Sequence, residues 1–305
     1  MAPTSAELYA LILAALNYLQ DDGGQFRKGA EKAGLTREEF WLLNRFRYFP
    51  GTMVPGDFLT FGPYSSISTY AQQLESLVAK KFTEKSEASR YRAAEAGRKL
   101  VDQMYRDYFA AIARHDRLSD ATTQRLGELA DRVVAFLVRQ PEVPAPITNA
   151  ARSIFPDIHR PWVYAERRVT AIAVFRDDAH IAAWREDGWS GPRIAVSTAL
   201  FKAGQPLPYD QLRAAVAQLN DKDFKSAISA LHSGGEVSHT ADDIYKLTTA
   251  GRQARQVVED LTEQNYAVLF NALTPDELQE LIALLEQVRG QSARNAHLRE
   301  SVRIF

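Results

Sequence analysis

The sequence predicts a mainly α-helical fold with small β-wings, in which one module occurs twice and the two copies form a pseudodimer. The stretches "SRYRAAEAGRKL" (89–100) and "DIYKLTTAGRQA" (243–254) each place a tyrosine six residues before a Gly-Arg pair, at an offset of 154 residues. The same offset aligns apolar positions without a gap from Tyr70 to Arg98, so that Tyr70 meets Phe224. A repeat of this kind indicates a structural unit written twice. The alternative is a coincidence between two helical stretches with the same period, because few residues are identical.

The match continues beyond the Gly-Arg pair when the offset changes by one residue. "LSDATTQRLGELADRVVAFL" then aligns with "LTPDELQELIALLEQV", and Ser119 and Thr274 are both predicted helix N-caps. Each cap precedes an apolar helical stripe, which must be buried against something. We therefore expect the helices around 96–137 and 251–289 to form the interface between the copies, together with the N-terminal helix. The stripes consist of Leu126, Leu129, Val133, Phe136, Leu137, Leu278, Leu281, Ile282, Leu285 and Val288.

In the first copy the expected elements follow from caps and apolar spacing. A short helix is expected at "VPGDFLTF", closed by "GPY", and a second at "SSISTYAQQLESLVAKK", which begins with serine caps. Phe82 and Thr83 are expected to form a short strand, and Tyr91 and Ala93 lie on the predicted return strand. A long helix then begins at "EAGRKL".

In the second copy the same parts are taken by "YDQLRAAVAQL", "NDKDFKSAISALHSGG", "EVSHTADDIYKLT" and "TAGRQARQVVEDLTEQNYAVLF". Asp221 is the expected N-cap of the second of these helices. "HSGGEV" is interpreted as a helix end with a glycine C-cap, followed by the entry to the wing.

A helix-turn-helix, a two-stranded wing and a long helix make up the winged-helix layout, so the sequence predicts tandem winged helix-turn-helix modules. The phrases "YKLTTAGRQARQVVEDLT" and "LTPDELQELIALLEQV" resemble the MarR and PadR families of bacterial regulators. The resemblance covers residues 40–137 and 190–289. It implies binding to double-stranded DNA, with two recognition helices meeting half-sites about 34 Å apart. Because both modules lie in one chain, we expect a single-chain pseudodimer, and whether two chains also form a homodimer stays open.

The chain is expected to divide into a first winged-helix module with its pairing helices at 1–140 and a second at 166–305. The connector between them is expected at 141–165. The stretch "RQPEVPAPITNAARSIFPDIHRP" (139–161), which indicates it, carries five of the 13 prolines.

The candidate DNA contacts lie on the recognition helices and the first wing. Short hydroxyl groups donate to phosphates, amides suit adenine edges, and cations neutralise the DNA backbone. The bland alternative for the first helix is a solvated face with good N-caps. The predicted DNA-binding residues are Ser65, Ser66, Ser68, Thr69, Gln72, Gln73, Lys85, Arg90, Arg92, Lys222 and Lys225.

The two copies differ in charge, and the first is expected to bind DNA more strongly. Residues 55–100 carry a net charge of +2, whereas residues 209–254 carry −1. Acidic residues beside the second wing, such as Asp242 and Asp243, would repel phosphates.

Composition limits the other function classes. The chain of 305 residues has a net charge of −1 and no cysteine, which excludes disulfides, thiol catalysis and cysteine-ligated zinc. The six histidines lack zinc spacing, and no phosphate-binding loop or nucleophile motif occurs, so we expect no metal, no cofactor and no enzyme activity. The early apolar run "LYALILAALNYL" is too short to span a membrane, so a cytoplasmic location is expected.

Two further predictions concern partners. Aromatic residues in "FWLLNRFRYF" (40–49), or Trp162, Tyr164, Trp184 and Trp189, are alternative walls for the small-molecule effector that the resemblance implies; the bland interpretation is that they form the core. The leading hypothesis is a DNA-binding transcriptional regulator. The alternative is a winged-helix interaction or chromosome-organising protein without sequence-specific DNA binding, which the near-neutral charge favours.

Overall fold

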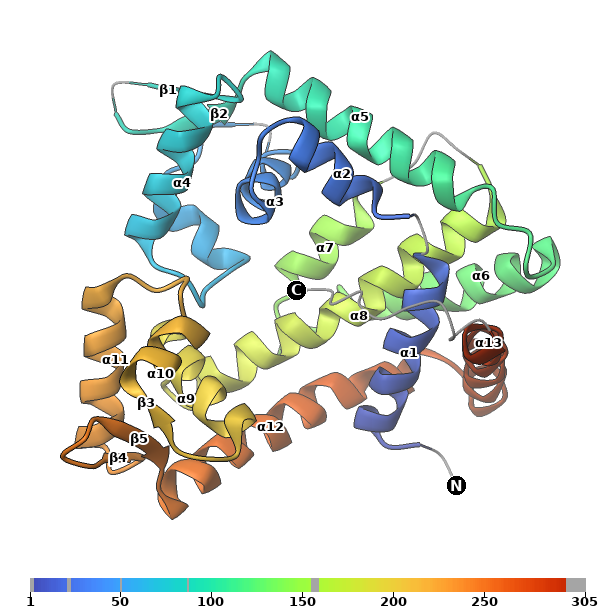
Figure 1. Cartoon of the computed structure of the whole chain (residues 1–305). Coiled ribbons are helices and arrows are strands. Elements are labelled where there is room, and N and C mark those ends of the chain that lie inside the picture. The colour runs from blue at the N-terminus through green and yellow to red at the C-terminus, as the bar shows by residue number, and fades with distance from the viewer. Residues whose placement is uncertain (1–2, 21–22, 50, 87, 155–158, 295–305) are drawn as a thin grey trace. The chain divides into compact units, whose positions relative to one another are not determined.

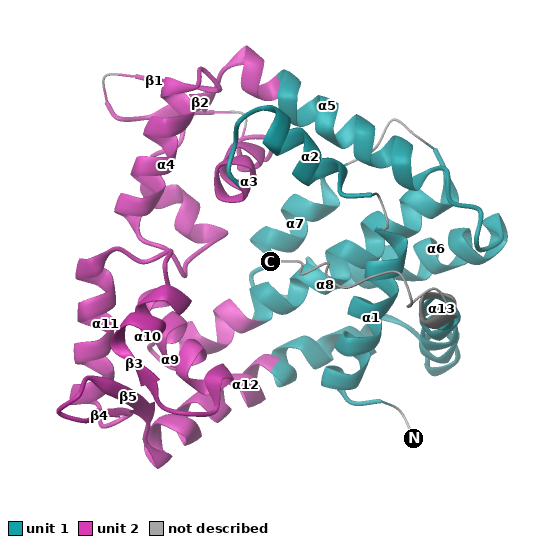
Figure 2. Ribbon diagram, in the orientation of Figure 1, with its two compact units in different colours: residues 1–36, 99–179, 263–305 teal, residues 37–98, 180–262 magenta. Residues whose placement is uncertain are grey.

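The computed structural model describes residues 3–20, 23–49, 51–86, 88–154 and 159–294. The chain forms two compact units, each assembled from separated stretches of sequence (Figure 2). Unit 1 comprises residues 1–36, 99–179 and 263–305, and unit 2 comprises residues 37–98 and 180–262. The expected mainly α-helical fold with small β-wings is confirmed.

Unit 2 begins with residues 37–98, here called the first segment. The segment contains α3 (Arg37–Arg45), η1 (Pro55–Thr60), α4 (Ile67–Ala79), β1 (Thr83–Lys85) and β2 (Tyr91–Ala93), and it ends in the first turn of α5 (Glu95–Ile112) (Figure 1). The first strand begins at Thr83 rather than at Phe82, and the "VPGDFLTF" helix is a 3-10 helix. Phe58, Leu74 and Leu77 are fully buried and join η1 and α4 in one core.

The rest of unit 2 contains residues 191–252, here called the second segment. The segment contains α9 (Gly191–Ala203), β3 (Leu207–Pro208), α10 (Tyr209–Ala215), α11 (Asp221–Ser233), β4 (Val237–His239) and β5 (Ile244–Leu247), and it ends in α12 (Thr249–Ala267). Its sheet has the order β3-β5-β4, so the prediction of a two-stranded wing missed one strand here. Proline cannot donate a ladder hydrogen bond, and Pro208 accordingly lies in an edge strand.

The elements of the two segments coincide at an offset of 154 residues. The bounds of α4 shifted by 154 are the bounds of α11, and the first residues of α3, η1 and α5 likewise become those of α9, α10 and α12. The strand pairs share one register, because Thr83 faces Ala93 as Val237 faces Leu247. The isolated bridge between Met53 and Tyr91 corresponds to the β3–β5 pair.

The turns that join these elements also correspond. A residue with positive φ follows α4 and α11, namely Lys81 (φ 64°) and Gly235 (φ 74°). Such a left-handed residue ends a helix and lets the next amide bond back across the last turn. The amide of Phe82 donates to the carbonyl of Leu77 over 2.9 Å, and the amide of Glu236 donates to the carbonyl of Leu231 over the same distance.

Unit 1 is built around helices that flank the two segments in sequence. Its elements are α1 (Ser5–Leu19), α2 (Gln25–Lys32), α6 (Asp120–Leu137), α7 (Pro146–Arg152), the first part of α8 (Pro161–Glu186), η2 (Val268–Ala272) and α13 (Pro275–Arg294), together with the parts of α5 and α12 assigned to it. The predicted caps of α6 and α13 are confirmed, since Ser119 accepts from the amide of Thr122 and Thr274 from that of Glu277. Eight of the ten stripe residues are buried; Phe136 and Ile282 are half-buried.

The proline-rich connector contains α7 and the start of α8. Asp178 of α8 is 2 % exposed and accepts hydrogen bonds from the amides of Ile147 (3.1 Å) and Thr148 (2.9 Å) at the start of α7. The carboxylate therefore supplies acceptors for amides that have no partner within α7.

Candidate nucleic-acid interface

The start of α4 is fixed by Ser66. Its hydroxyl oxygen accepts a hydrogen bond from the amide of Thr69 over 3.2 Å, which makes it the N-cap. Ser66, one of the predicted DNA-binding residues, is only 3 % exposed, so its side chain does not face outward as a direct DNA contact would require. Its hydroxyl also lies 2.7 Å from the hydroxyl of Thr69. The Ser66 hydroxyl therefore takes part in the turn that holds the start of α4.

The other hydroxyl groups at the start of α4 contact the second segment. Ser65 and Thr69 both donate to the carbonyl oxygen of Gln218, over 3.0 and 3.1 Å. The side-chain amide of Asn220 donates to the hydroxyl of Ser68. Figure 1 shows these contacts' place within unit 2: the N-terminal ends of α4 and α11 face each other, and each sheet lies near the C-terminal end of its helix.

The next turn of α4 carries the two predicted amide side chains. Gln72 is exposed and Gln73 is half-buried. Gln72 and Gln73 lie three and four residues after Thr69, the last of the hydroxyl groups that bond to the second segment. Their role as base contacts remains a prediction.

The wing of the first segment carries three exposed cations, two of which pair with carboxylates. Lys85 pairs with Glu75 of α4, and its ammonium lies 5.6 Å from the centre of the Tyr91 ring. The hydroxyl of Tyr91 donates to the same carboxylate over 2.6 Å. The hydrogen bonds from Lys85 and Tyr91 hold the pKa of Glu75 below its ordinary value. Arg92 donates to Glu84 over 2.7 Å.

Arg90 has neutral partners instead. Its guanidinium donates to the hydroxyl of Thr52 over 2.7 Å and to the carbonyl of Thr52 over 3.1 Å. These bonds orient the side chain without neutralising its charge. Arg90 is thus a preoriented cation at the exposed tip of the wing.

The recognition-type helix of the second segment begins differently from the prediction. The N-cap of α11 is Asn220, whose side-chain oxygen accepts from the amide of Asp223 over 2.8 Å. Asp221, the predicted cap, is the first helical residue and accepts from Arg213 over 3.1 Å. Asparagine and aspartate both suit the N-cap position, and because the helix begins at Asp221 the cap is Asn220. Lys222 and Lys225 are exposed on α11, and their contact with DNA remains a prediction.

Several residues that shape this surface were not found from the sequence. Thr52 orients Arg90, Glu75 and Glu84 hold two wing cations, and Gln218 offers a backbone carbonyl. The Glu84–Arg92 pair has a local signal, because the two residues face each other across a predicted hairpin. The bond to the carbonyl of Gln218 has none, because it joins residues about 150 positions apart through a backbone group.

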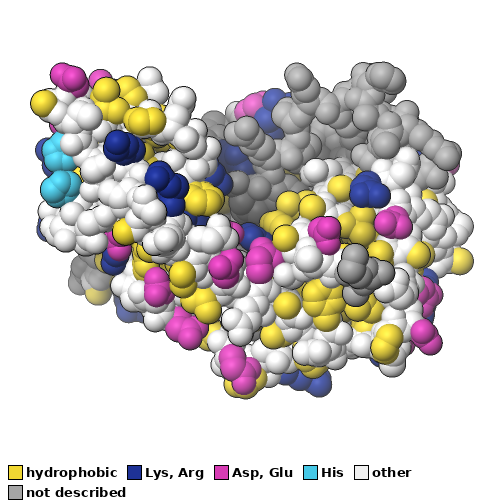
Figure 3. Space-filling view, turned by 90° about the horizontal axis from the view of Figure 1, so that it is seen from below, with side chains coloured by type: hydrophobic (Ala, Val, Ile, Leu, Met, Phe, Trp, Pro, Cys, Tyr) yellow, Lys and Arg dark blue, Asp and Glu magenta, His cyan; other side chains and the backbone are white. Residues whose placement is uncertain are grey.

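The surface charge is mixed. On the face in Figure 3, basic and acidic side chains both occur, and no single basic field covers it. No group of three or more His, Asp or Glu residues within the described ranges is placed to hold a metal ion. Among those same residues, no helix combines the length and the apolar character that crossing a membrane requires.

Comparison with known proteins gives one match. The model of a helix-turn-helix family matches residues 62–298, which include α4, the first wing and all of the second segment. Searches of curated proteins and of solved structures gave no match.

Proposed function

The chain belongs to a helix-turn-helix family, and from this premise we propose that it is a DNA-binding transcriptional regulator with two winged-helix modules in one chain. The modules are the first and second segments, residues 37–98 and 191–252. The finer resemblance to MarR and PadR regulators, and action as a single-chain pseudodimer, are parts of the same proposal. The main support for the proposal is that the two segments have the same order of elements and the same strand register, in a chain that belongs to a helix-turn-helix family.

The correspondence of the two segments supports an internal duplication. Chance similarity of period would align apolar positions, but it would not align a helix of 13 residues, a strand register and a bridge at one offset. Two arginines add a matched detail. Arg98 donates to the carbonyl of Ala93 over 2.6 Å, and Arg252 donates to the carbonyl of Leu247 over 2.8 Å.

Contacts between counterpart residues support the pseudodimer. In a twofold contact, a residue close to the axis meets its own counterpart. Arg125 of α6 and Glu280 of α13 are counterparts at the offset of 155, and two hydrogen bonds of 2.8 and 2.7 Å join them within unit 1. Within unit 2, the helix caps Ser66 and Asn220 are counterparts, and Asn220 bonds to Ser68 beside that cap.

The first module is proposed to provide the stronger DNA contact. Each cation that reaches a phosphate releases counterions and adds to the affinity. Arg90 lies at the tip of the first wing, and its partner Thr52 is neutral and leaves the charge of the arginine in place. At the corresponding tip, the second module has Asp242 and Asp243, and carboxylates near phosphates repel them.

The proposal is tested by fluorescence anisotropy of the full chain on a labelled duplex over a series of salt concentrations. The duplex is the tightest one recovered by selection from a random library. A variant with Lys85, Arg90 and Arg92 all changed to Ala should bind more weakly. Its slope of log affinity against log salt should fall by about two to three, since each phosphate contact contributes about 0.9.

A matched triple variant in the second segment serves as the control. Lys222, Lys225 and Lys246 are exposed on α11 and β5, and changing them to Ala removes the same charge. We expect a smaller change in slope. Recovery of no preferred sequence, together with an unchanged slope in the first triple variant, would contradict the proposal.

A second candidate function follows from the contacts at the start of α4. Helix-turn-helix proteins usually read bases with the N-terminal residues of the recognition helix. Here Ser65, Ser68 and Thr69 bond to the second segment. This favours an interaction or chromosome-organising protein in which the modules are rigid docking units. The same titration separates the candidates, because this one expects no sequence preference and no salt-dependent affinity carried by the wing.

A further inference from the structure

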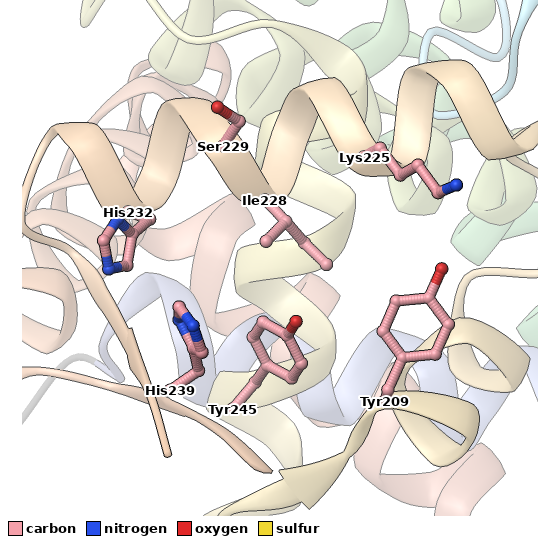
Figure 4. A pocket seen from close by; sticks show the side chains of 7 residues that line it. All are labelled: Tyr209, Lys225, Ile228, Ser229, His232, His239 and Tyr245. Atoms are coloured by element: carbon pink, nitrogen blue, oxygen red, sulfur yellow. The ribbon is translucent and has the colours of Figure 1, made fainter. Parts of the chain in front are cut away.

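The second segment contains a small open pocket between α11 and its sheet. The volume of the pocket is about 220 Å³, below the range of about 300–1,000 Å³ that is usual for ligand pockets of drug size. Figure 4 shows Lys225 and Tyr209 at one end and His232 and His239 at the other, with Ile228 between them. An occupant must therefore be small, with an apolar middle and polar groups.

The corresponding place in the first segment is already filled by a carboxylate. Ser229, His239 and Tyr245 of the pocket stand, at the offset of 154, at the positions of Glu75, Lys85 and Tyr91. In the first segment Glu75 accepts from the hydroxyl of Tyr91 over 2.6 Å and pairs with Lys85. The second segment keeps the tyrosine and a nitrogen donor but has a serine in place of the carboxylate.

The hydroxyl of Tyr245 makes only a long hydrogen bond, so it can donate a shorter one to a ligand. Tyr245 is 7 % exposed, and its hydroxyl donates to Asp243 over 3.4 Å, at the long end of hydrogen-bond distances. Burial, and next the charge of Asp243, raise the pKa of the Tyr245 hydroxyl, which stays protonated and available as a donor. Asp243 lies at the exposed wing tip and does not line the pocket.

The pocket also carries more nitrogen donors than its counterpart. Lys225 and His232 replace Ala71 and Val78 of the first segment. The rings of His232 and His239 lie 5.0 Å apart. The ring of His239 is stacked on that of Tyr245, with a centroid separation of 5.4 Å and an interplanar angle of 23°. These aromatic side chains give the pocket an apolar lining with polar groups at their ends, which suits an aromatic ligand.

We propose that this pocket binds a small carboxylate with a flat apolar body, and that the ligand's carboxylate takes the place that Glu75 fills in the first segment. Carboxylate is favoured over phosphate because the side chain that fills the equivalent place is a carboxylate held by an equivalent tyrosine. The site lies outside both aromatic groups expected from the sequence to surround an effector. The proposal does not depend on DNA binding, so either can fail alone.

The test is a titration of the full chain with benzoate, followed by NMR of the histidine ring protons. The chain has six histidines, and the signals of His232 and His239 are assigned from His232→Gln and His239→Gln variants. We expect benzoate to shift both signals saturably and the neutral analogue benzamide to bind at least tenfold more weakly. Ser229→Glu supplies the carboxylate internally and should lower benzoate affinity at least tenfold. Ser226→Glu, at an exposed position of α11 outside the pocket, changes the charge equally and should bind as wild type does.

Each remaining outcome overturns the proposal. Equal binding by Ser229→Glu and wild type would place benzoate elsewhere. Equal binding of benzamide would show that the pocket does not select a carboxylate. Tighter binding of inorganic phosphate would assign the pocket to phosphate groups, including those of DNA. Shifts caused by Zn²⁺ without any caused by benzoate would make the two histidines a metal site.

Discussion

In the first segment the hairpin carries Lys85, Arg90 and Arg92, whereas the second segment has His239, Ile244 and Lys246 at the corresponding positions. The backbones beneath these side chains nevertheless pair in the same register. Several of the residues that both segments share face the core. Tyr91 and Tyr245 are both buried, as are Leu77 and Leu231 at the ends of the two helices.

The comparison separates the residues that determine the backbone conformation from the exposed residues that differ between the segments. Packing and turn chemistry fix helix ends and strand register, because a wrong residue there leaves a clash or an unpaired amide. Exposed side chains can change with little effect on stability. The exposed surfaces of the two segments can therefore differ over a similar backbone, with three cations on the first wing and a pocket beside the sheet of the second segment.

The largest expected effect concerns the helices that follow each segment. Leu129 of α6 and Leu281 of α13 are 0 and 2 % exposed. Changing either to Asp buries a charge, and the free energy of unfolding should fall by about 4 kcal/mol or more. Urea unfolding followed by circular dichroism measures it. If one variant kept wild-type stability, the prediction that its helix belongs to the interface between the two segments' helices would be wrong.

Two glycines test the common backbone directly. A β-carbon at Gly97 would lie 2.2 Å from the carbonyl oxygen of Phe82, and one at Gly251 would lie 2.0 Å from that of Glu236. Backbone atoms cannot move aside cheaply, so each Gly→Ala variant should lose about 1–3 kcal/mol of unfolding free energy.

Gly290 of α13 provides the control for these variants, because nothing lies within 4 Å of its added β-carbon. Gly290→Ala should raise stability, since alanine favours a helix over glycine by about 1 kcal/mol. Unequal losses at Gly97 and Gly251, with one near zero, would break the correspondence between the segments.

The helix caps should give smaller and similar effects. Ser66→Ala and Asn220→Ala each remove the acceptor for an amide in the first turn of α4 or α11. Each should lower the unfolding free energy by about 1 kcal/mol. Ser226→Ala, in the exposed middle of α11, should be neutral or slightly stabilising. A cap variant as stable as that control would show that its helix start is held by other contacts.

The smallest expected effect separates the segments by pH. The pKa of Glu75 is lowered in the folded chain, so its pairing stabilises the fold above the ordinary pKa of glutamate and loses this contribution as the pH falls. Glu75→Gln should therefore lower the midpoint of thermal unfolding slightly at pH 7 and leave it unchanged near pH 2. A difference that persisted in acid would assign the effect to packing.

Much of the fold could be predicted from the sequence because its signals are local. The serine cap of α4, the glycines after α11 and the apolar stripes of α6 and α13 each act within one or two turns of the chain. The constant offset added information, since it predicted that "EVSHTADDIYKLT" folds as the first wing does. The short strand β3 escaped because two residues that include a proline carry no strand pattern.

The candidate site was harder to predict because its contacts are not local. Nothing in the spacing of Ser65 and Thr69 indicates that both bond to the carbonyl of Gln218. The burial of Ser66 could not be predicted either, because serine occurs both as an exposed hydrogen-bond donor and as a buried helix cap. Wing cations could be found by charge, but their pairing with Glu75 and Glu84 depends on the folded hairpin.

The central claim is that the first segment binds DNA more strongly than the second. Titration of four single variants on one selected duplex tests it most directly. Arg90→Ala should weaken binding most and lower the salt slope by about one. Lys85→Ala should follow, because Glu75 already neutralises that lysine. Lys222→Ala and Lys225→Ala should change affinity least. Equal losses from all four variants would show that the second segment binds DNA as well as the first, and would contradict the claim.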